Sequence, residues 1–469
     1  MKSTTINAIR GDETPRREDR GLLDRFLNLF ADVRAGEGVT AVLLMLNIFL
    51  LLAGYYLLKT IREPLILASP EGGAEVKSYS AAAIAGILMI LVPIYSALAS
   101  RVSRVRLINS VTLFFILCLV VFFVLSQAHV PIGVPFFIWV GIFSLVVIAQ
   151  LWAFANDVYT VEEGKRLFAI VGFGASLGAI AGSFVTGKLV KEYGPYPFMI
   201  GAAVLLAVCM LLTNIVNLRE KAARAGKPAP GDLAESAGAP AAASAPADDR
   251  VRGRSGFALV LSDRYLLLIA GLMLLSNLVN TNGEYILGKT VVTLYTKAHG
   301  AAAAGGLDEK KVVGEFYGNF FTVVNLVSAL VQAFLVSRFI KYFGVRGALL
   351  VLPLVGLIGY GAMAFVPVLA FIRTAKIAEN SIDYSLQNTT RNALYLPTSR
   401  EAKYKAKQAN DTFFVRFGDV ISAGMVFAGT MWLGFASKHF AIVNLGLIAA
   451  WLLVAIALGR KFHQLAHSD

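Results

Sequence analysis

Twelve apolar stretches of about 20 residues or more dominate this chain, and each is long enough to cross a lipid bilayer as a helix. The stretches are continuous instead of alternating every second residue, which excludes a porin-like barrel. Only 16% of the residues are charged, whereas about a quarter are charged in a soluble domain. The sequence therefore predicts an all-α integral membrane protein. The expected spans are 39–68, 79–99, 106–127, 133–155, 166–188, 197–217, 262–292, 312–337, 346–366, 367–391, 408–433 and 439–458.

A polar segment divides the spans into two sets of six. Residues 219–255 are rich in Ala, Pro, Gly and charged residues, as is typical of a flexible linker. Six spans, a linker and six more spans is the layout of the major facilitator fold, with two pseudo-symmetric six-helix bundles. We expect a cytoplasmic N-terminal segment at 1–37, bundles at 38–218 and 256–459, a cytoplasmic linker at 219–255 and a cytoplasmic tail at 460–469.

The two sets of spans resemble each other in sequence. The segment Gly54–Thr60 matches Gly283–Thr290, and further matches follow at offsets that grow from 229 to 244 residues along the chain. The offset grows where the second set has longer loops. A parallel duplication of this kind is typical of a transporter with two related halves.

The segment before the first span predicts a surface helix. In RGLLDRFLNLFADVR, residues 20–34, the apolar side chains fall on one helical face. Such a segment favours a helix that lies on the membrane surface. The first 37 residues are polar and basic, without the apolar core of a cleavable signal peptide.

The lysines and arginines are distributed unevenly over the loops. If the N-terminus is cytoplasmic, 28 of the 43 basic residues lie in cytoplasmic segments and seven in the opposite loops. This fourfold bias predicts that both termini are cytoplasmic, and we expect a multi-pass protein of the bacterial inner membrane. The net charge of +13 therefore reflects orientation in the bilayer, and we expect no nucleic-acid partner.

The motifs that could indicate catalysis or cofactor binding lack the structural context that such sites require. Gly283–Thr290 satisfies the Walker A pattern, but it lies inside an apolar span without the required preceding strand. Cys118 and Cys209 both lie in apolar stretches, so neither a disulfide framework nor a thiolate metal site is expected. We expect no enzymatic activity, no cofactor and no metal, and a monomer in the bilayer.

Ionisable residues inside the spans are the functional signal. A charge at mid-membrane costs roughly 2.5–3.5 kcal/mol on insertion scales, so such residues persist where they pair or line a water-filled cavity. Seven cations against five anions leave about two unpaired positive charges, which suits an anionic substrate. The cations are Lys59, Arg62, Lys289, Arg373, Lys376, Arg391 and Arg416, and the anions are Glu63, Glu284, Glu379, Asp383 and Asp419.

The spacing of these charges predicts a cavity. Lys59, Arg62 and Glu63 fall at i, i+3 and i+4 on one face of the first span. Polar residues recur in steps of three or four along 373–391, while Leu or Ala residues fill the other faces. The alternative is that these groups pair with one another and stabilise helix packing. Charged residues near 162–166 and 400–407 fit either a gate between the halves or a solvated loop.

At these residues the sequence resembles a known family, the nucleotide (ATP/ADP) translocases of intracellular bacteria and plastids. Its charged run in the first span is similar to Lys59-Thr-Ile-Arg62-Glu63 here, although Thr60 replaces an acid. Asp419 stands where the family often has Lys, and the linker is unusually long. The other matching segments are Phe154-Ala-Asn156, Glu163-Gly-Lys165-Arg166, Gly172-Phe-Gly174, Glu284 with Lys289, Lys403, Lys405, Lys407, Asp411, and Arg416-Phe-Gly418.

The resemblance implies exchange of nucleotides, of the ATP/ADP type, or transport of a related phosphorylated anion by alternating access. The alternative is a proton-coupled transporter of another anionic metabolite or lipid. A receptor that kept the fold is the alternative from another class. Expected substrate-binding residues are Lys59, Arg62, Glu284, Lys289, Lys376, Asp383, Asn388, Arg391, Arg416, Tyr55 and Trp152; expected gating or ion-pair residues are Glu63, Glu163, Lys165, Glu379, Lys407 and Asp411.

Overall fold

The computed structural model describes residues 32–34, 37–99, 101–159, 161–225, 256–366, 368–399 and 401–466. Within these ranges the regular structure is entirely helical, which confirms the all-α prediction. A bilayer offers no water to backbone N–H and C=O groups, so apolar segments satisfy them internally as helices. Most of the predicted surface helix at 20–34 lies outside the described residues, and its last three residues are not helical. Of the linker predicted at 219–255, residues 219–225 continue α7 as helix, and residues 226–255 lie outside the described part of the chain.

Six long helices precede the linker, and we refer to them as the N-half. Each corresponds to one predicted span. Several extend beyond the apolar stretch, because helix ends reach into the polar boundary of the bilayer. The helices are α2 (Gly38–Leu67), α3 (Ala74–Ala99), α4 (Arg104–Gln127), α5 (Gly133–Val158), α6 (Val161–Tyr193) and α7 (Pro197–Ala225).

The elements after the linker, which we call the C-half, are more interrupted. Five of them are π-helical segments, a feature that often marks functional sites. The elements are α9 (Gly256–Ser262), α10 (Arg264–His299), η2 (Ala301–Ala303), α11 (Leu307–Leu330), η3 (Val331–Leu335), α12 (Val336–Phe365), α13 (Leu369–Ile382), η4 (Asp383–Gln387), α14 (Asn388–Ala393), η5 (Ala402–Ala406), α15 (Lys407–Ala409), η6 (Asn410–Phe414), α16 (Val415–Phe427), η7 (Ala428–Trp432) and α17 (Ser437–Ala466).

Ten helices among the described residues are long and apolar enough to cross a membrane. One of them, Leu307–Phe365, reverses at Gly344, where φ is 66° and only glycine is free of strain. It therefore crosses twice, through α11 and then through the second part of α12. The segment 369–393 forms a further crossing through α13, η4 and α14, although it carries more charges than the ten apolar helices. The described chain thus crosses twelve times.

The helix α3 begins five residues earlier than the sequence predicts, at Ala74 instead of 79. Glu75 lies in its first turn, where the helix dipole favours a negative charge. Both Glu75 and Lys77, assigned to a loop by the sequence analysis, are therefore helical and face neighbouring helices. The helix α10 likewise continues to His299 instead of ending at 292.

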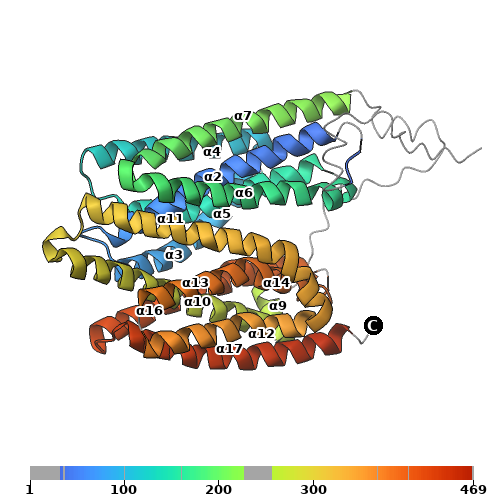
Figure 1. The fold of residues 1–469 in the computed structure, drawn as a ribbon. Coiled ribbons are helices and arrows are strands. Elements are labelled where there is room, and N and C mark those ends of the chain that lie inside the picture. The colour runs from blue at the N-terminus through green and yellow to red at the C-terminus, as the bar shows by residue number, and fades with distance from the viewer. Residues whose placement is uncertain are drawn as a thin grey trace, which may run out of the picture.

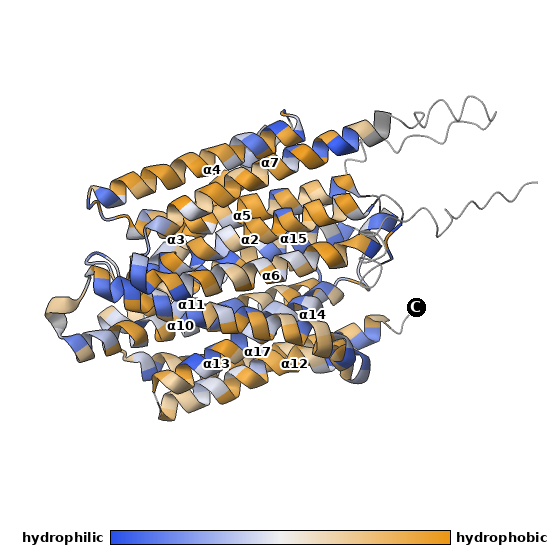
Figure 2. Ribbon diagram, turned by 45° about the horizontal axis from the view of Figure 1, so that its top comes forward, coloured by the Kyte–Doolittle hydropathy of each residue, from blue (hydrophilic) through white to orange (hydrophobic). Residues whose placement is uncertain are grey.

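The two halves lie side by side, with their helices running in roughly the same direction (Figure 1). The starts of α2 and α9 and the end of α17 lie at one end, which we call the terminal end. The loops 68–73, 128–132, 194–196 and 300–306 lie at the other, which we call the far end. Apolar residues cover most of the helix surfaces and polar residues gather toward the ends (Figure 2). Exposed Ile90, Ile358 and Leu453 are suited to contact with lipid tails.

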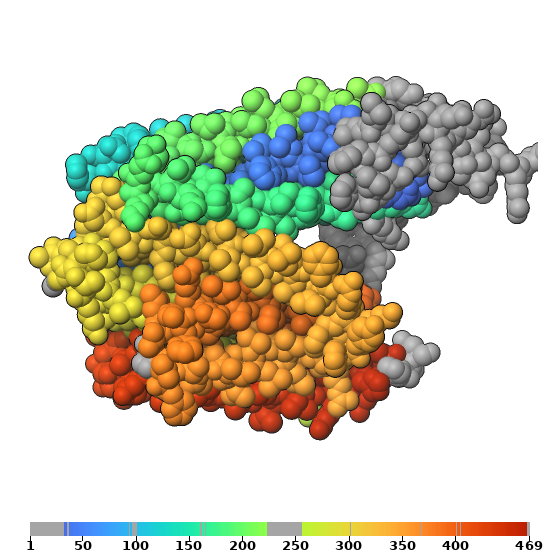
Figure 3. All heavy atoms as spheres, viewed as in Figure 1, coloured from blue at the N-terminus to red at the C-terminus, as the bar shows by residue number. Residues whose placement is uncertain are grey.

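The halves pack closely near the far end and separate toward the terminal end. The helices α6 and α11 lie against each other at the far end and diverge toward the terminal end (Figure 1). At their contact, a Cβ built on Gly187 would lie 3.0 Å from the backbone of Gly318. Small residues at such positions let two helix backbones approach. The space-filling view shows a notch between the halves on the side of the terminal end (Figure 3).

Candidate functional site

A row of alternating charges crosses the interface between the halves. Arg62 and Glu63 lie on α2, and the Arg62 Nε is 3.1 Å from the Glu63 carboxylate. Lys77 on α3 places its Nζ 2.6 Å from the other Glu63 oxygen and 3.7 Å from Glu284 on α10. The sequence predicts Arg62, Glu63 and Glu284 as site residues, and the structure brings all three together. Lys77 is the N-half group that reaches Glu284 of the C-half.

The row continues inside the C-half through Lys376 on α13. Its Nζ lies 3.7 Å from Glu284, 3.0 Å from Glu379 and 2.8 Å from the Asn280 side-chain oxygen. The Tyr360 hydroxyl donates to Glu379 over 2.9 Å. Lys376 is completely buried, so its charge depends on these partners. We call Arg62, Glu63, Lys77, Glu284, Lys376 and Glu379 the central ion-pair chain.

Lys59 stands apart from this chain in an aromatic cage. Its Nζ lies 4.9 Å from the Tyr56 ring centroid, 4.7 Å from that of Phe321 and 5.2 Å from that of Tyr384. The Tyr55 ring is 6.0 Å away, and the Tyr384 hydroxyl is 3.1 Å from the ammonium. Among the described residues, no carboxylate forms an ion pair with Lys59. Aromatic faces stabilise a desolvated cation but leave its positive charge uncompensated.

The predicted site residue Lys289 lies away from this centre. Its ammonium contacts Glu75 of α3 at 2.7 Å, and Tyr285 donates to the same carboxylate at 3.0 Å. This ion pair joins α10 to α3 at the far end and is nearly half exposed on the Lys289 side. The structure therefore favours closure of the far end as the role of Lys289.

A polar cavity of about 260 Å³ opens in the C-half toward the terminal end. Arg391 lies 3.4 Å from Asp383, and Lys407 donates to Asn392 over 2.8 Å. Three π-helical segments, η4, η5 and η6, lie along the part of the chain that forms it. The predicted residues Asn388, Arg391, Lys407 and Asp411 all line this cavity.

Arg416 is tied to its own half. Its guanidinium lies 3.2 Å from Asp419, which also accepts hydrogen bonds from Asn277 and Thr281 of α10 at 2.8 and 3.0 Å. Asp419 occupies the position where the resemblance expects Lys. Here it neutralises Arg416 and fastens α16 to α10.

The remaining predicted residues lie in the N-half. Trp152 packs edge-on against Phe168 at 6.1 Å between ring centroids, as part of the N-half core. Glu163 is partly buried near the start of α6. The side chain of Lys165 lies outside the described part of the chain. The neighbouring Arg166 forms a two-pronged ion pair with Glu37, at 2.8 and 3.0 Å, and so joins α6 to the chain before α2.

Sequence reasoning missed three contributors to the interface, Glu75, Lys77 and Tyr360. The charges Glu75 and Lys77 stand two residues apart after Gly72-Gly73, which looks like a loop signal. A start of α3 at Ala74 would have revealed them, because one helical turn then places them beside the first span. Tyr360 lies in an apolar stretch and carries no signal that distinguishes it from packing.

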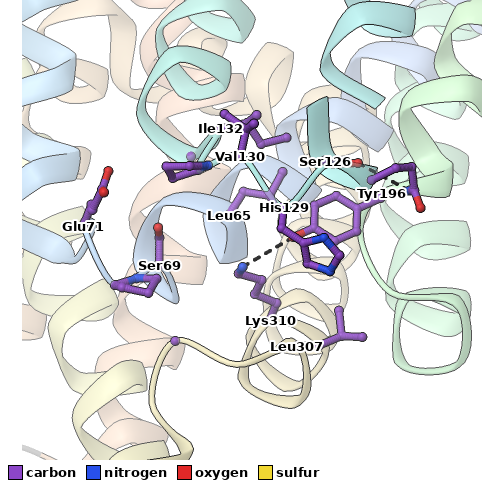
Figure 4. Close-up of a pocket in the computed structure, with 15 residues that line it drawn as sticks. Leu65, Ser69, Glu71, Ser126, His129, Val130, Ile132, Tyr196, Leu307 and Lys310 are labelled. Atoms are coloured by element: carbon purple, nitrogen blue, oxygen red, sulfur yellow. Dashed lines mark hydrogen bonds between the residues drawn. The ribbon is translucent and has the colours of Figure 1, made fainter. Parts of the chain in front are cut away.

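A cavity of about 610 Å³ lies between the halves at the far end. Lys310 of α11 and Tyr196 of the α6–α7 loop face each other there across 3.4 Å, with His129 beside them (Figure 4). A Cβ on Gly305 would lie 3.2 Å from Pro70, so the loops of the two halves touch at this cavity. The central charges are not among its lining residues.

Further contacts join the halves between their centre and the far end. Asn325 of α11 donates to the Ala179 carbonyl of α6 over 3.2 Å, and Lys191 lies 3.5 Å from Glu315. Together with the Lys289–Glu75 pair, these contacts lie in the parts of the helices nearer the far end. The site thus consists of buried charges at the halves' junction, shut off at the far end. Within the described residues, no group of three His, Cys, Asp or Glu side chains could hold a metal ion.

Known proteins with similar sequences include ADP,ATP carrier proteins of Chlamydia. The ADP,ATP carrier protein 1 of Chlamydia pneumoniae is 23% identical over 89% of this chain and 90% of its own. The ADP,ATP carrier protein 2 of Chlamydia trachomatis serovar D is 24% identical over 93% of this chain and 91% of its own.

Solved structures with a similar fold are membrane transporters. The nucleoside transporter NupG has a TM-score of 0.60, with 13% sequence identity, over 91% of this chain and 99% of its own. A bacterial homologue of the iron transporter ferroportin, in its inward-facing state, has a TM-score of 0.59, with 13% identity, over 90% of this chain and 98% of its own.

The family model described as the Major Facilitator Superfamily matches residues 41–377, well over half of the chain. That match covers the six helices of the N-half and the C-half up to α13. It agrees with the twelve crossings in two halves and with the buried charges at their junction. The chain belongs to the Major Facilitator Superfamily and is a membrane transporter, not an enzyme.

Proposed function

We propose that this transporter exchanges nucleotides, ADP against ATP or closely related phosphorylated anions, by alternating access between its two halves. The observation that carries the proposal is Lys59. It is a buried ammonium that receives aromatic rings from both halves and has no ion-paired carboxylate among the described residues. An anionic substrate would supply the missing negative charge. The similar ADP,ATP carrier proteins of Chlamydia support a nucleotide as that substrate.

The phosphate chain would bind at Lys59 and beside the central ion-pair chain. Arg62 contributes a guanidinium that is paired with Glu63 through Nε only and stacks 4.6 Å from the Phe137 ring centroid. Its other donors are suited to phosphate oxygens. The rings of Tyr55 and Tyr384 beside Lys59 would contact the base or ribose. Arg391, Asn388 and Lys407 would line the route from the terminal end.

We further propose that the terminal end faces the cytoplasm of a bacterial cell and that the protein works as a monomer. The excess of Lys and Arg in the loops of the terminal end supports this orientation. The arrangement seen here, closed at the far end, is then the inward-facing state. Nucleotides would enter and leave the central site through the notch on the cytoplasmic side.

A proton-coupled transporter of another anion is the alternative. Each carboxylate of the central ion-pair chain contacts a Lys or an Arg. A proton carrier needs a carboxylate that gains and loses its proton during the cycle, so the dependence of uptake on a pH gradient distinguishes the two functions. Uptake that followed a pH gradient without internal nucleotide would contradict exchange.

The test is nucleotide uptake into proteoliposomes that contain the purified full-length chain. Labelled ATP should enter vesicles preloaded with ADP, and not empty vesicles. The Lys59→Gln variant should lose at least 90% of this exchange, because the bound phosphates lose their uncompensated cation. The matched control is Lys310→Gln, which removes a lysine that joins the halves at the far end; it should exchange normally. No nucleotide uptake by the unaltered protein would refute the proposal.

A further inference from the structure

Lys77 joins the two halves at the most deeply buried of their ion pairs. Its Nζ contacts Glu63 of its own half at 2.6 Å. From the C-half it meets the Glu284 carboxylate at 3.7 Å and lies 5.5 Å from the Tyr317 ring centroid. Because α3 belongs to the N-half and α10 to the C-half, the far end cannot open while Lys77 stays with Glu284.

The other ion pairs that cross between described residues of the halves are more exposed to water. The Lys side chain is 68% exposed in the Lys191–Glu315 pair and 45% exposed in the Lys289–Glu75 pair, but only 10% exposed at Lys77. Water replaces a partner easily at an exposed pair, so such pairs contribute little. A buried charge that loses its partner has no such replacement. The Lys77–Glu284 pair is therefore the one that needs another anion in place of Glu284 when the halves separate.

The Lys77 ammonium has capacity for that anion. Its contact with Glu63 at 2.6 Å occupies one donor, whereas Glu284 at 3.7 Å lies beyond hydrogen-bond distance. An ammonium carries three donors. An acceptor that approaches from the substrate site would therefore find donors ready.

The substrate site lies within reach of Lys77 along α11. Lys77 packs over the ring of Tyr317, and Lys59 packs over the ring of Phe321, four residues later on the same helical face. One turn of helix separates these rings by roughly 6 Å along the axis. A chain of two or more phosphates held by Lys59 would span that distance and bring a terminal oxygen to Lys77.

We propose that Lys77 is a clasp between the halves, and that a substrate phosphate releases it by competing with Glu284. This rests on the proposed nucleotide exchange and names the positioning residue that makes transport an exchange. Without substrate the clasp holds the far end shut, so the empty transporter does not switch. With substrate, Lys77 passes from Glu284 to a phosphate, and α3 moves away from α10 with its charge still paired.

The first test measures coupling in proteoliposomes. The unaltered protein should release labelled ADP only when external ATP or ADP is present. Lys77→Gln should release ADP into nucleotide-free buffer at least tenfold faster than the unaltered protein, and Lys77→Arg, which keeps the charge, should restore coupling. The matched control Lys191→Gln removes an exposed pair between the halves and should stay coupled. Strict coupling in Lys77→Gln, or equal leak in Lys77→Arg, would overturn the proposal.

The second test reads the far end without transport. Cys118 and Cys209 are replaced by Ala, and Lys191→Cys with Glu315→Cys provides a pair for a short bifunctional thiol reagent. In the substrate-free protein the cross-link yield should be high and should fall when ADP is added. Adding Lys77→Gln should lower the yield at least twofold without ADP. An unchanged yield in this background would refute the clasp.

The two tests separate failure of the clasp from failure of the nucleotide assignment. If the unaltered protein moves no nucleotide, the proposed function fails, yet the substrate-free cross-link still tests Lys77. If Lys77→Gln is not obtained as folded protein, Glu284→Gln breaks the same contact from the C-half. It should lower the cross-link yield in the same way, and an undiminished yield would count against the clasp.

Discussion

Lys376 shows at the scale of one residue how a buried charge depends on its partners. It is completely enclosed, and it contacts Glu284, Glu379 and Asn280. Breaking such a pair by removing one partner leaves an uncompensated charge, at a cost of about 3–5 kcal/mol. The same contacts restrain Lys376, so Lys59 is the cation with more freedom to meet a phosphate.

We predict that Lys376→Met lowers the thermal unfolding temperature strongly, because Glu379 is left buried without its cation. Adding Glu379→Gln in the same chain should recover about half of the loss, since Glu284 still has Lys77 as a partner. The measurement is thermal unfolding of both variants in detergent, followed by a fluorescent thiol dye. No recovery in the double variant would show that packing, not charge, causes the loss.

Glu37 gives a prediction for pH. Burial raises the pKa of Glu37, but hydrogen bonds from the Arg166 guanidinium and from the Arg34 backbone N–H outweigh it, so the pKa lies below its ordinary value. A lowered pKa means that the ionised group stabilises the fold above pH 4.5, and that this contribution is lost as the pH falls through the folded-state pKa. Glu37→Gln should therefore be less stable than the unaltered protein at pH 7, and the difference should shrink as the pH falls below 4.5 and through the folded-state pKa. A difference in thermal unfolding that stays constant as the pH falls through this range would contradict this origin.

At the scale of the elements, α6 and α11 determine how closely the halves approach. A Cβ on Gly318 would clash with the backbone of Gly187 and lie 3.3 Å from the Ser183 carbonyl oxygen. Contact between backbones, with no flexible side chain to yield, means that any added carbon pushes the helices apart. Asparagine hydrogen bonds inside each half do not affect this approach of the halves. Asn47 bonds to Thr213 and Asn282 bonds to Asn444, so each bond holds together the first and last crossings of one half.

We predict that Gly318→Ala weakens closure of the far end. Overpacking of this kind costs about 1–3 kcal/mol, and it falls on the closed state alone, so the population should shift toward an open far end. The yield of the Lys191→Cys with Glu315→Cys cross-link should drop at least twofold. The matched control is Gly361→Ala on α12, where an added Cβ meets nothing within 4 Å. Equal yields in the two alanine variants would show that the glycine contact does not limit closure.

At the scale of the whole molecule, the two ends differ: the loops are basic at one end, and the halves are in contact at the other. The basic loops lie at the terminal end, where the halves diverge, and ion pairs such as Lys289–Glu75 join described residues of the two halves toward the far end. An ion such as a nucleotide would therefore reach Lys59 from the basic side. The exposed apolar helix faces in between are suited to lipid.

We predict the orientation from that asymmetry. A green fluorescent protein fused after residue 469 should fluoresce in a bacterial host, whereas alkaline phosphatase fused at the same position should stay inactive, because it folds only outside the cytoplasm. Phosphatase inserted into the loop 300–306 at the far end should be active. The reverse pattern would place the basic end outside and would overturn the inward-facing assignment.

The amino-acid sequence is enough to predict the crossings and most of the buried charges, because bilayer thickness and the cost of a buried charge constrain composition. The twelve predicted stretches correspond to twelve crossings, and Lys59, Arg62, Glu63 and Glu284 do lie at the junction of the halves. The span predicted at 367–391 forms the crossing through α13, η4 and α14 despite its charges.

Which of those charges contact each other depends on how the helices pack. Lys289 and Glu284 lie five residues apart on α10, yet one joins Glu75 at the far end and the other joins Lys77 and Lys376 at the centre. Spacing along a helix gives the face of a side chain but not the helix opposite it, so partners from α3 or α13 cannot be read from α10. Lys77 was missed for the same reason. Its role follows from the start of α3 at Ala74 and from the approach of the halves at the far end, where burial turns an ordinary lysine into the contact between them.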